Sequence, residues 1–335
     1  MQEIYDNIFH EVSTYTDHHI SPRNLYIIRQ PERSLMIDTS VRFEHDWNVI
    51  QRMVQDLGID YRKLDVFITH NHPDHTGLIL ELQAKGAAVF MNPTEEKERA
   101  DFMHSYLCDT QIRIANLRTM GVTADGTPEV YQAFMEYTDR AYLERKEPVS
   151  FEFTPVHPGD VLEYGKYRLE VVLLRGHTAG QCGLYEPEKK LLFCGDQIMT
   201  QIVPIVISQQ KDIGLLRSYL ESLEEMPKKY GDCRFLSSHY AFIEDPKQEV
   251  DRIMFSYHKT CERMLEILRE NGQWMTSRDI GVRAYGRSQG PPDYSHFAAC
   301  TYIWAKTFSC MDLMHEEGLV ERREEDGIVY WKAAQ

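Results

Sequence analysis

The chain has 335 residues, of which 42% are hydrophobic and 27% are charged, and its formal net charge is −15. This balance is typical of a soluble globular protein, and the length predicts one large domain with a smaller one beside it. The acidic charge disfavours a nucleic-acid partner, because neutralising phosphates requires lysine and arginine.

The cysteines and the N-terminus predict a cellular compartment. The seven cysteines form no CxxC pair, which is typical of a reduced interior. The first residues lack the apolar region of a signal peptide, and no apolar run is long enough to span a membrane. We therefore expect a cytoplasmic protein without a membrane partner. Cys194 is expected to be a buried small residue rather than a ligand.

Strands and one helix are predicted in the first part of the chain. Residues 25–28 and 34–38 are apolar runs separated by a polar turn, which indicates two strands. From 46 to 57 the apolar residues recur at helical spacing, and Gly58 is suited to end that helix. The β-branched and aromatic run at 64–68 is typical of a buried strand.

A dense group of metal-ligand side chains follows that strand directly. Residues 69–77 read Thr-His-Asn-His-Pro-Asp-His-Thr-Gly. Imidazole and carboxylate together suit zinc, iron or manganese. With 14 histidines in the whole chain, three of them in six residues beside an aspartate argue against chance. The candidates in this loop are His70, His72, Asp74 and His75.

One loop cannot complete a metal site, and three later strand-like runs also end in candidate ligands. Taken singly, each of these would more often be a structural loop residue. Four repetitions of strand followed by ligand instead predict a shared site. The later candidates are His177 after 169–174, Asp196 after 190–194 and His239 after 233–236. We expect His18, His19 and His157 to be structural or surface residues.

Helical patterns dominate two further stretches. Residues 94–147 replace the strand rhythm with apolar and aromatic residues at helical spacing, which predicts a helical insertion. This insertion is either a lid with an apolar pocket wall or a packed helical pair that could form a homodimer contact. The tail, which begins at about 258, is predicted to form three helices followed by a hairpin. The first helix spans 259–271, the second follows a capping sequence at 276–279, and the third spans 294–317.

The order of these motifs resembles the metallo-β-lactamase-fold hydrolase superfamily. His-x-His-x-Asp-His, Gly-His-Thr, Gly-Asp and a late histidine occur in the family's order over about residues 20–245. The resemblance implies an α/β fold, a four-layer αβ/βα sandwich, in residues 1–257, with the insertion at 94–147. The tail at 258–335 resembles the winged-helix domain of one branch of the superfamily, which includes lactamase-like endoribonucleases.

The resemblance also implies a role for each candidate ligand. The first metal would be held by His70, His72 and His177, and the second by Asp74, His75 and His239, with Asp196 bridging the two. Asp38 would brace the histidine loop. Two residues depart from the family's usual pattern where substrate would touch, namely Arg175 and Tyr240.

The complete ligand set implies a hydrolase with two divalent cations, zinc in the first place and iron or manganese as alternatives. A bridging hydroxide would attack the substrate, Asp74 and Asp196 would anchor the ions, and the general acid stays open between Tyr240 and water. The leading expectation is an ester or thioester hydrolase resembling glyoxalase II, acting on a small molecule with an apolar or acyl portion. The alternatives are a phosphodiesterase or endoribonuclease, and an iron-dependent redox protein.

The charge of the tail argues against the endoribonuclease branch. Residues 258–335 contain ten Lys and Arg against twelve Asp and Glu, a net charge of −2. The helix that would read a groove carries Lys306 as its only strong base, whereas such a helix should be basic. We therefore expect a structural or substrate-capping tail.

Overall fold

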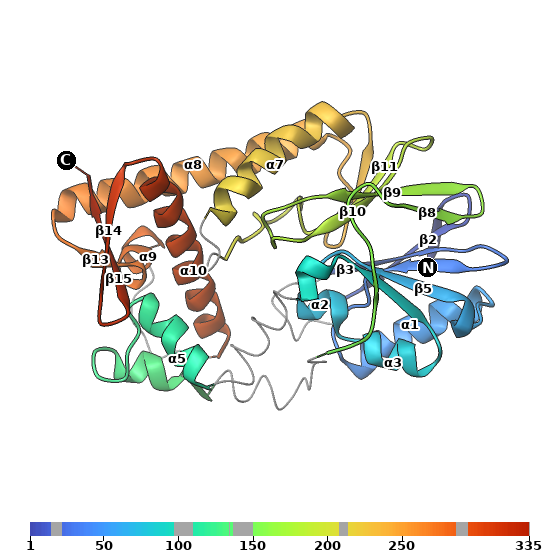
Figure 1. Cartoon of the computed structure of the whole chain (residues 1–335), viewed down its shortest axis with the longest axis horizontal. Helices are drawn as coiled ribbons and strands as arrows, with labels where there is room; N and C mark the ends of the chain where they lie inside the picture. The colour runs from blue at the N-terminus through green and yellow to red at the C-terminus, as the bar shows by residue number, and fades with distance from the viewer. Residues whose placement is uncertain are drawn as a thin grey trace. The chain divides into compact units, whose positions relative to one another are not determined.

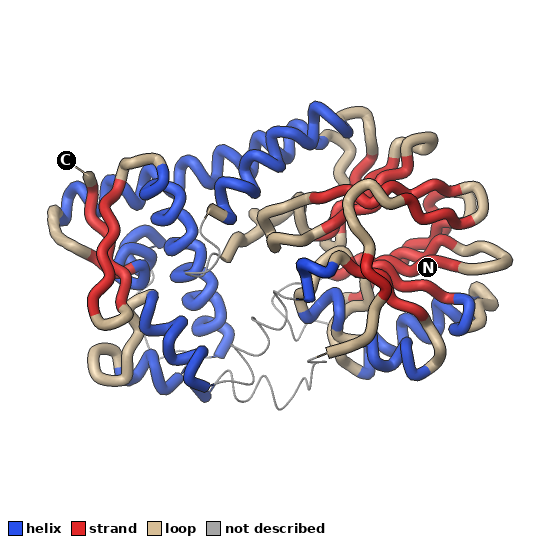
Figure 2. The backbone as a smooth tube through the Cα atoms, viewed as in Figure 1, coloured by secondary structure: helices blue, strands red, loops and turns tan. Residues whose placement is uncertain are grey.

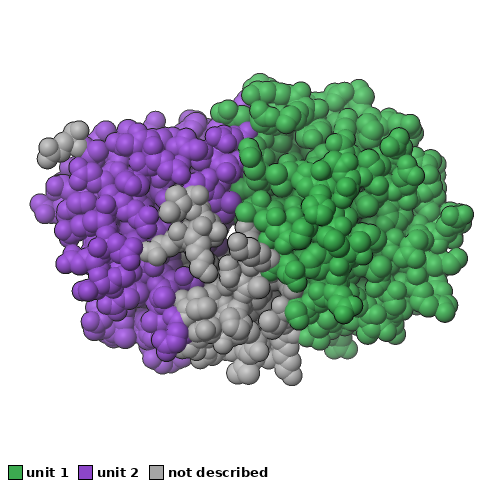
Figure 3. Space-filling model, in the orientation of Figure 1, with its two compact units in different colours: residues 1–101, 145–204, 222–250 green, residues 102–144, 205–221, 251–335 purple. Residues whose placement is uncertain are grey.

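The computed structural model describes residues 1–14, 22–96, 110–133, 135–136, 150–207, 214–285 and 294–334. The chain divides into two compact units, coloured separately in Figure 3. Unit 1 comprises Met1–Asp101, Arg145–Pro204 and Ser222–Val250, and unit 2 comprises Phe102–Glu144, Ile205–Glu221 and Asp251–Gln335.

Unit 1 contains two β-sheets, drawn in red in Figure 2. The seven-stranded sheet has the order β1-β2-β3-β4-β5-β6-β7, with β1 (Gln2–Tyr5), β2 (Ile8–Ser13), β3 (Arg23–Ile28), β4 (Ser34–Ile37), β5 (Leu64–Ile68), β6 (Ala88–Met91) and β7 (Thr154–Pro155). The five-stranded sheet has the order β12-β11-β10-β9-β8, with β8 (Val161–Tyr164), β9 (Tyr167–Leu173), β10 (Cys182–Glu186), β11 (Leu191–Gly195) and β12 (Arg234–Ser237). The predicted strands in these ranges are confirmed.

Strand direction brings several loops to one edge of the first sheet. β4, β5, β6 and β7 are parallel neighbours, so their carboxyl ends lie at the same edge. Asp38, Thr69 and Asn92 are the first residues after β4, β5 and β6. In the second sheet β11 and β12 are also parallel, which brings the loops after Gly195 and Ser237 to a common edge. The candidate ligands follow strands of both sheets.

Side chains that alternate between the two faces of a strand connect the layers of unit 1. In β5, Val66 and Ile68 pack with α1 (Glu44–Asp56) and α3 (Ile79–Ala84), whereas Phe67 packs with residues of the second sheet such as Leu184. Helices α1 and α3 therefore cover one face of the first sheet, as Figure 1 shows, and the second sheet covers the other face. α1 ends next to Gly58, whose φ of 64° is left-handed, as expected.

The outer face of the second sheet supports the fourth layer. α7 (Leu215–Tyr230) brings Tyr230 to 5.0 Å from Tyr185 of β10, measured between ring centres. Leu184, the neighbouring residue in β10, faces the opposite way into the core between the sheets. The expected αβ/βα sandwich is confirmed for unit 1.

Unit 2 is mainly helical. Its C-terminal elements are α8 (Pro246–Asn271) from Asp251 onwards, β13 (Met275–Thr276), α9 (Ser277–Tyr285), α10 (Tyr294–Glu316), β14 (Val320–Glu325) and β15 (Ile328–Ala333). The three strands pair in the order β13-β15-β14. The hairpin turns at Asp326 and Gly327, which both have positive φ. The capping sequence is also confirmed, because the Asp279 N–H donates to Thr276 Oγ1 at 3.2 Å. This order of elements is compatible with a winged helix, which stays a prediction.

The helices differ from expectation in one respect. A helix was expected to begin at 259, but α8 begins at Pro246 and runs unbroken over 26 residues. No proline or glycine interrupts this stretch after its first residue, so nothing in the sequence stops the helix. Residue 258, where the predicted tail begins, lies inside α8, and unit 2 resumes in α8 at Asp251.

The predicted insertion is described only in part. It contains α5 (Thr110–Thr119) and a loop over residues 121–127. Its described residues from 110 onwards belong to unit 2, whereas residues 94–96 belong to unit 1. Several aromatic residues expected to line a pocket, among them Phe102, Tyr106 and Tyr142, lie outside the described residues, as do His18 and His19. The described helices include none long and apolar enough to cross a membrane.

Candidate metal centre

The histidine loop begins where β5 ends and continues into a short helix. His72 is the N-cap of α2 (Pro73–Thr76), and Pro73 occupies its first turn. Proline is favoured there because the first N–H groups of a helix lack intrahelical partners in any case. The loop therefore presents His70 and His72 in extended chain, and the helix presents Asp74 and His75 one turn later.

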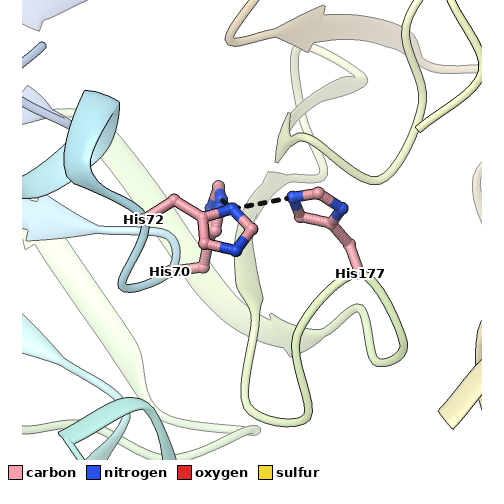
Figure 4. Close-up of side chains that lie close together, drawn as sticks. All are labelled: His70, His72 and His177. Atoms are coloured by element: carbon pink, nitrogen blue, oxygen red, sulfur yellow. Dashed lines mark hydrogen bonds between the residues drawn. The ribbon is translucent and has the colours of Figure 1, made fainter. Parts of the chain in front are cut away.

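Three histidine rings converge at the first group of candidate ligands. Figure 4 shows His72 between His70 and His177, with dashed lines joining the rings. His72 Nδ1 lies 3.0 Å from His70 Nε2 and 3.1 Å from His177 Nε2. Nitrogens about 2.0–2.1 Å from a tetrahedral zinc are roughly 3.3 Å apart. The three nitrogens are therefore spaced as ligands of one ion, and this group could hold a metal.

Four further ligand-type residues lie beside this group. Asp74, His75 and His239 could hold a metal ion, and so could His70, His75 and Asp196. His239 Nε2 lies 3.3 Å from Asp74 Oδ2 and 3.4 Å from Asp196 Oδ1. His75 Nε2 lies 3.5 Å from the same Asp196 oxygen. All seven residues expected to bind metal are brought together.

Asp196 lies between the two groups. Its Oδ1 atom faces His75 and His239, while its Oδ2 atom lies 3.8 Å from His177 Nε2. Asp74 lies 3.7 Å from His75 Nε2 and 3.3 Å from His239 Nε2. Asp196 thus has neighbours in both groups of histidines, and its role as a bridging ligand stays a prediction.

The site also leaves buried polar atoms without hydrogen-bond partners. Within the described part of the chain, these include Asp74 Oδ2, His75 Nε2, Asp196 Oδ1 and His239 Nε2. An unpaired buried polar group is costly, and each usually has an explanation such as an ion. A cation held by these atoms would satisfy all of them, so the donor set fits divalent metal ions.

Hydrogen bonds on the far side of the rings determine which nitrogens carry lone pairs. His75 donates Nδ1–H to Asp38 Oδ2 at 2.8 Å, and His239 donates Nδ1–H to the Pro22 carbonyl at 3.0 Å. Since these acceptors carry no hydrogen, Nε2 of each neutral ring keeps its lone pair for the site.

His70 is oriented by a relay of the same kind. The Thr69 hydroxyl donates to Asp38, so its oxygen accepts from His70 Nδ1–H at 3.0 Å. His70 Nε2 then faces the site with its lone pair. Partners of this kind fix the tautomer and orientation of metal-binding histidines.

Asp38 occupies the position expected of a bracing residue. It has a left-handed φ of 57°, and its carboxylate accepts from the Thr69 N–H at 2.8 Å and from the Ser238 hydroxyl at 3.1 Å, besides His75. One carboxylate therefore ties the loops after β4, β5 and β12 together.

The pKa values of the histidines shift in opposite directions in the two groups. Burial, with His177 nearby, lowers the pKa of His72 to about 3, and burial holds the pKa of His70 well below its usual value. Burial also lowers the pKa of His239, but Asp196 and Asp74 outweigh it and raise this pKa to about 9. His70 and His72 are therefore neutral and can bind a cation, whereas His239 carries a positive charge that balances the two carboxylates.

The two residues expected at the substrate side lie close in sequence to candidate ligands. Arg175 is exposed, two residues before His177, and its carbonyl accepts from Gln197 Nε2 at 3.2 Å. Tyr240 follows His239 with a left-handed φ of 61°, and burial raises the pKa of its hydroxyl. Their contact with substrate stays a prediction. Cys194 is buried and His157 is exposed, both as expected.

Three buried polar residues around the loops were missed by sequence reasoning. Asn24 donates to the carbonyls of Ser237 and Tyr240, on either side of His239. Gln181 accepts from the Asp196 N–H at 3.3 Å, and Glu95 accepts from the histidine loop. Each lies near the end of a strand, but a single polar residue in such a place gives no signal of its partners.

Comparison with protein families agrees with the motifs. A model described as the metallo-beta-lactamase superfamily matches residues 20–239. The chain belongs to this superfamily. Its members are mainly metal-dependent hydrolases, and the predicted resemblance is confirmed.

Curated relatives include two hydroxyacylglutathione hydrolases. The protein of Brucella anthropi is 23% identical over 159 residues, which cover 43% of this chain and 59% of that protein. The protein of Rhodobacter capsulatus is 46% identical over 46 residues, covering 14% of this chain and 18% of its own length. The chain spans less than two thirds of these relatives.

Two solved structures share the fold over nearly the whole chain. A metallo-beta-lactamase family protein from Thermus thermophilus has a TM-score of 0.76 at 18% identity and covers 98% of both chains. A beta-lactamase domain protein from Burkholderia ambifaria has a TM-score of 0.81 at 19% identity, covering 99% of this chain and 94% of its own. At these identities the likeness concerns the fold alone.

Proposed function

We propose that the chain is a binuclear metal-dependent hydrolase that acts on an ester or thioester. The observation that carries this proposal is the set of buried nitrogen and oxygen atoms without hydrogen-bond partners, which belong to four candidate ligands. Together with the three converging histidines, they fit two divalent cations side by side, with zinc as the first choice and iron or manganese as alternatives.

The candidate ligands form two groups, each of which would hold one ion. His70, His72 and His177 would hold the first ion through neutral nitrogens, and Asp74, His75 and His239 would hold the second, with Asp196 between them. Bound divalent cations lower the pKa of a coordinated water and polarise a carbonyl or phosphoryl oxygen. The negative charge of Asp74 and Asp196 would compensate the two cations, and Asp74, on one side only, would orient the nucleophile.

The ester or thioester preference concerns the substrate rather than the metal centre. It draws on the relatives named hydroxyacylglutathione hydrolase, whose match is partial, and on the acidic net charge of −15, which disfavours a polyanionic substrate. The substrate would be a small molecule with an apolar or acyl portion.

A substrate panel tests this proposal. The purified protein, reconstituted with zinc, manganese or iron, is assayed on acyl thioesters, lactones and phosphodiesters. We expect turnover of thioesters or esters that a chelator abolishes and added metal restores. A marked preference for phosphodiesters would contradict the substrate class, and chelator-resistant turnover would contradict the metal-dependent mechanism.

A further inference from the structure

A buried carboxylate outside the ligand set connects the two loops that carry the three converging histidines. Glu95 lies shortly after β6 and is fully buried. Its Oε2 atom accepts from the N–H of Asn71, the residue between His70 and His72, at 2.8 Å. Its Oε1 atom accepts from the Thr178 hydroxyl at 2.7 Å and from the Gly180 N–H at 2.8 Å.

We propose that Glu95 is a positioning residue, which clamps the loop of His70 and His72 against the loop of His177 and so sets the spacing of their nitrogens. The consequence for metal binding rests on the proposed function, whereas the clamp itself is a property of the loops.

The donors explain why this position holds a carboxylate. The Asn71 amide, the Thr178 hydroxyl and the Gly180 amide all point hydrogens at the two oxygens. An ionised carboxylate only accepts, so it satisfies all three, and charged acceptors form stronger hydrogen bonds than neutral ones. A glutamine would turn its NH₂ group towards one of these donors, which would lose its partner.

The segment that carries Glu95 is itself held in place. Asn71 Nδ2 donates to the Glu95 carbonyl at 2.9 Å, so the clamp has two bonds to this loop. Asn92 Nδ2 donates to Cys182 Sγ at 3.3 Å, and the Asn92 carbonyl accepts from the Glu95 N–H at 3.0 Å. The backbone that carries the Glu95 side chain is therefore held in place by hydrogen bonds.

The approach of the second loop depends on a glycine. A Cβ atom on Gly180 would lie 2.7 Å from Thr94 Cβ and 2.9 Å from Glu95 Oε1. Such distances are too short for ordinary contact, so any larger residue would push this loop away from Glu95. The clamp thus needs both the carboxylate of Glu95 and a glycine at position 180.

The first test measures metal affinity at each site separately. The isosteric change Glu95→Gln is made in two backgrounds, His239→Ala, which would leave the three-histidine site, and His177→Ala, which would leave the other. Competition with a chromophoric chelator reports zinc affinity without any activity assay. Loss of an outer partner weakens metal binding about 10–100-fold. We expect that loss in the His239→Ala background and a change of less than about threefold in the His177→Ala background. Equal effects in both would indicate a merely structural role and overturn the proposal.

The second test needs no metal. Amide hydrogen exchange in the metal-free protein should become faster in peptides covering 69–77 and 175–183 when Glu95 is changed to Gln. Asp65→Asn is the matched control, because Asp65 is also buried and bonded, to Tyr164 Oη at 2.8 Å, but contacts neither loop. Unchanged exchange in Glu95→Gln would refute the clamp.

The two tests separate the proposals. A wild-type protein that binds no metal would refute the proposed function, while exchange in the same protein would still decide whether the clamp exists. If Glu95→Gln does not fold, Thr178→Val removes one of the three donors with little change of shape, and faster exchange in both peptides is expected from it, to a smaller degree. Exchange at the wild-type rate in that variant would count against the clamp.

Discussion

His75 donates its Nδ1 hydrogen to Asp38 across 2.8 Å, and this bond determines which nitrogen of the ring faces the candidate metal centre. The same carboxylate accepts from Thr69, which in turn orients His70. One residue that binds no metal in our account therefore orients a ligand of each proposed ion.

Asp38→Asn tests this relationship. An asparagine keeps one acceptor oxygen but places an NH₂ group among donors, so His75 or Thr69 loses its partner. We expect metal affinity to fall about 10–100-fold, the usual loss for such outer partners. Chelator competition measures it, with Asp65→Asn as the control. Wild-type affinity in Asp38→Asn would mean that the rings are oriented by other contacts.

Asp196→Ala and Asp74→Asn should differ in how much metal and turnover they lose. Asp196 lies near candidate ligands of both groups, whereas Asp74 lies beside His75 and His239. Without Asp196 two neighbouring cations would be poorly compensated, so metal content and turnover should both collapse.

Asp74→Asn keeps an oxygen donor but loses its charge. We expect the first ion to stay and the second to weaken. Loss of a charge-assisted hydrogen bond worth about 1.5–3 kcal/mol slows turnover roughly ten- to more than a hundredfold. Metal analysis and kinetics of both variants provide the comparison. Full metal content and near-normal turnover in Asp196→Ala would show that the bridge is misassigned.

His10 gives unit 1 a pH-dependent stability. Its Nε2–H donates to Asn24 Oδ1 at 3.0 Å, and burial lowers its pKa. The unfolded chain, with a histidine pKa of about 6.5, then binds more protons than the folded protein. Stability is therefore lost as pH falls from about 6.5 towards the folded pKa.

His10→Gln should reduce this loss, because glutamine can donate to Asn24 without titrating. Urea unfolding at pH 5.5 and 7.5 provides the measurement, with the exposed His157→Gln as the control. An unchanged difference between the two pH values in His10→Gln would assign the effect to other groups.

Much of the site could be predicted from sequence because its ligands follow recognisable strands. The run at 64–68 and the dense histidine loop after it predict four of the seven candidate ligands, and the parallel order of β4, β5 and β6 brings the ends of these strands together. Glu95 could not be predicted in the same way. It stood at the start of an apparent helical insertion, and its partners Thr178 and Gly180 are 83 and 85 positions away. Contacts between loops depend on the packing of both sheets, and no local pattern records them.

A variant at Lys306 tests whether the tail binds nucleic acid. It is the one strong base expected on a groove-reading helix, but its Nζ lies 4.6 Å from the centre of the Tyr257 ring, and burial lowers its pKa. We expect weak binding of duplex or single-stranded nucleic acid, unchanged in Lys306→Ala, by fluorescence anisotropy at physiological salt. Submicromolar binding that is lost in Lys306→Ala would contradict the charge argument.

The central claim is that two metal ions share one site. Anomalous X-ray diffraction at the absorption edge of the reconstituted metal tests it most directly. Our account predicts a pair of peaks ~3.5–4 Å apart, one among His70, His72 and His177 and the other among Asp74, His75 and His239, with Asp196 touching both. A single peak remote from His239 and Asp74 in the fully loaded protein would contradict it.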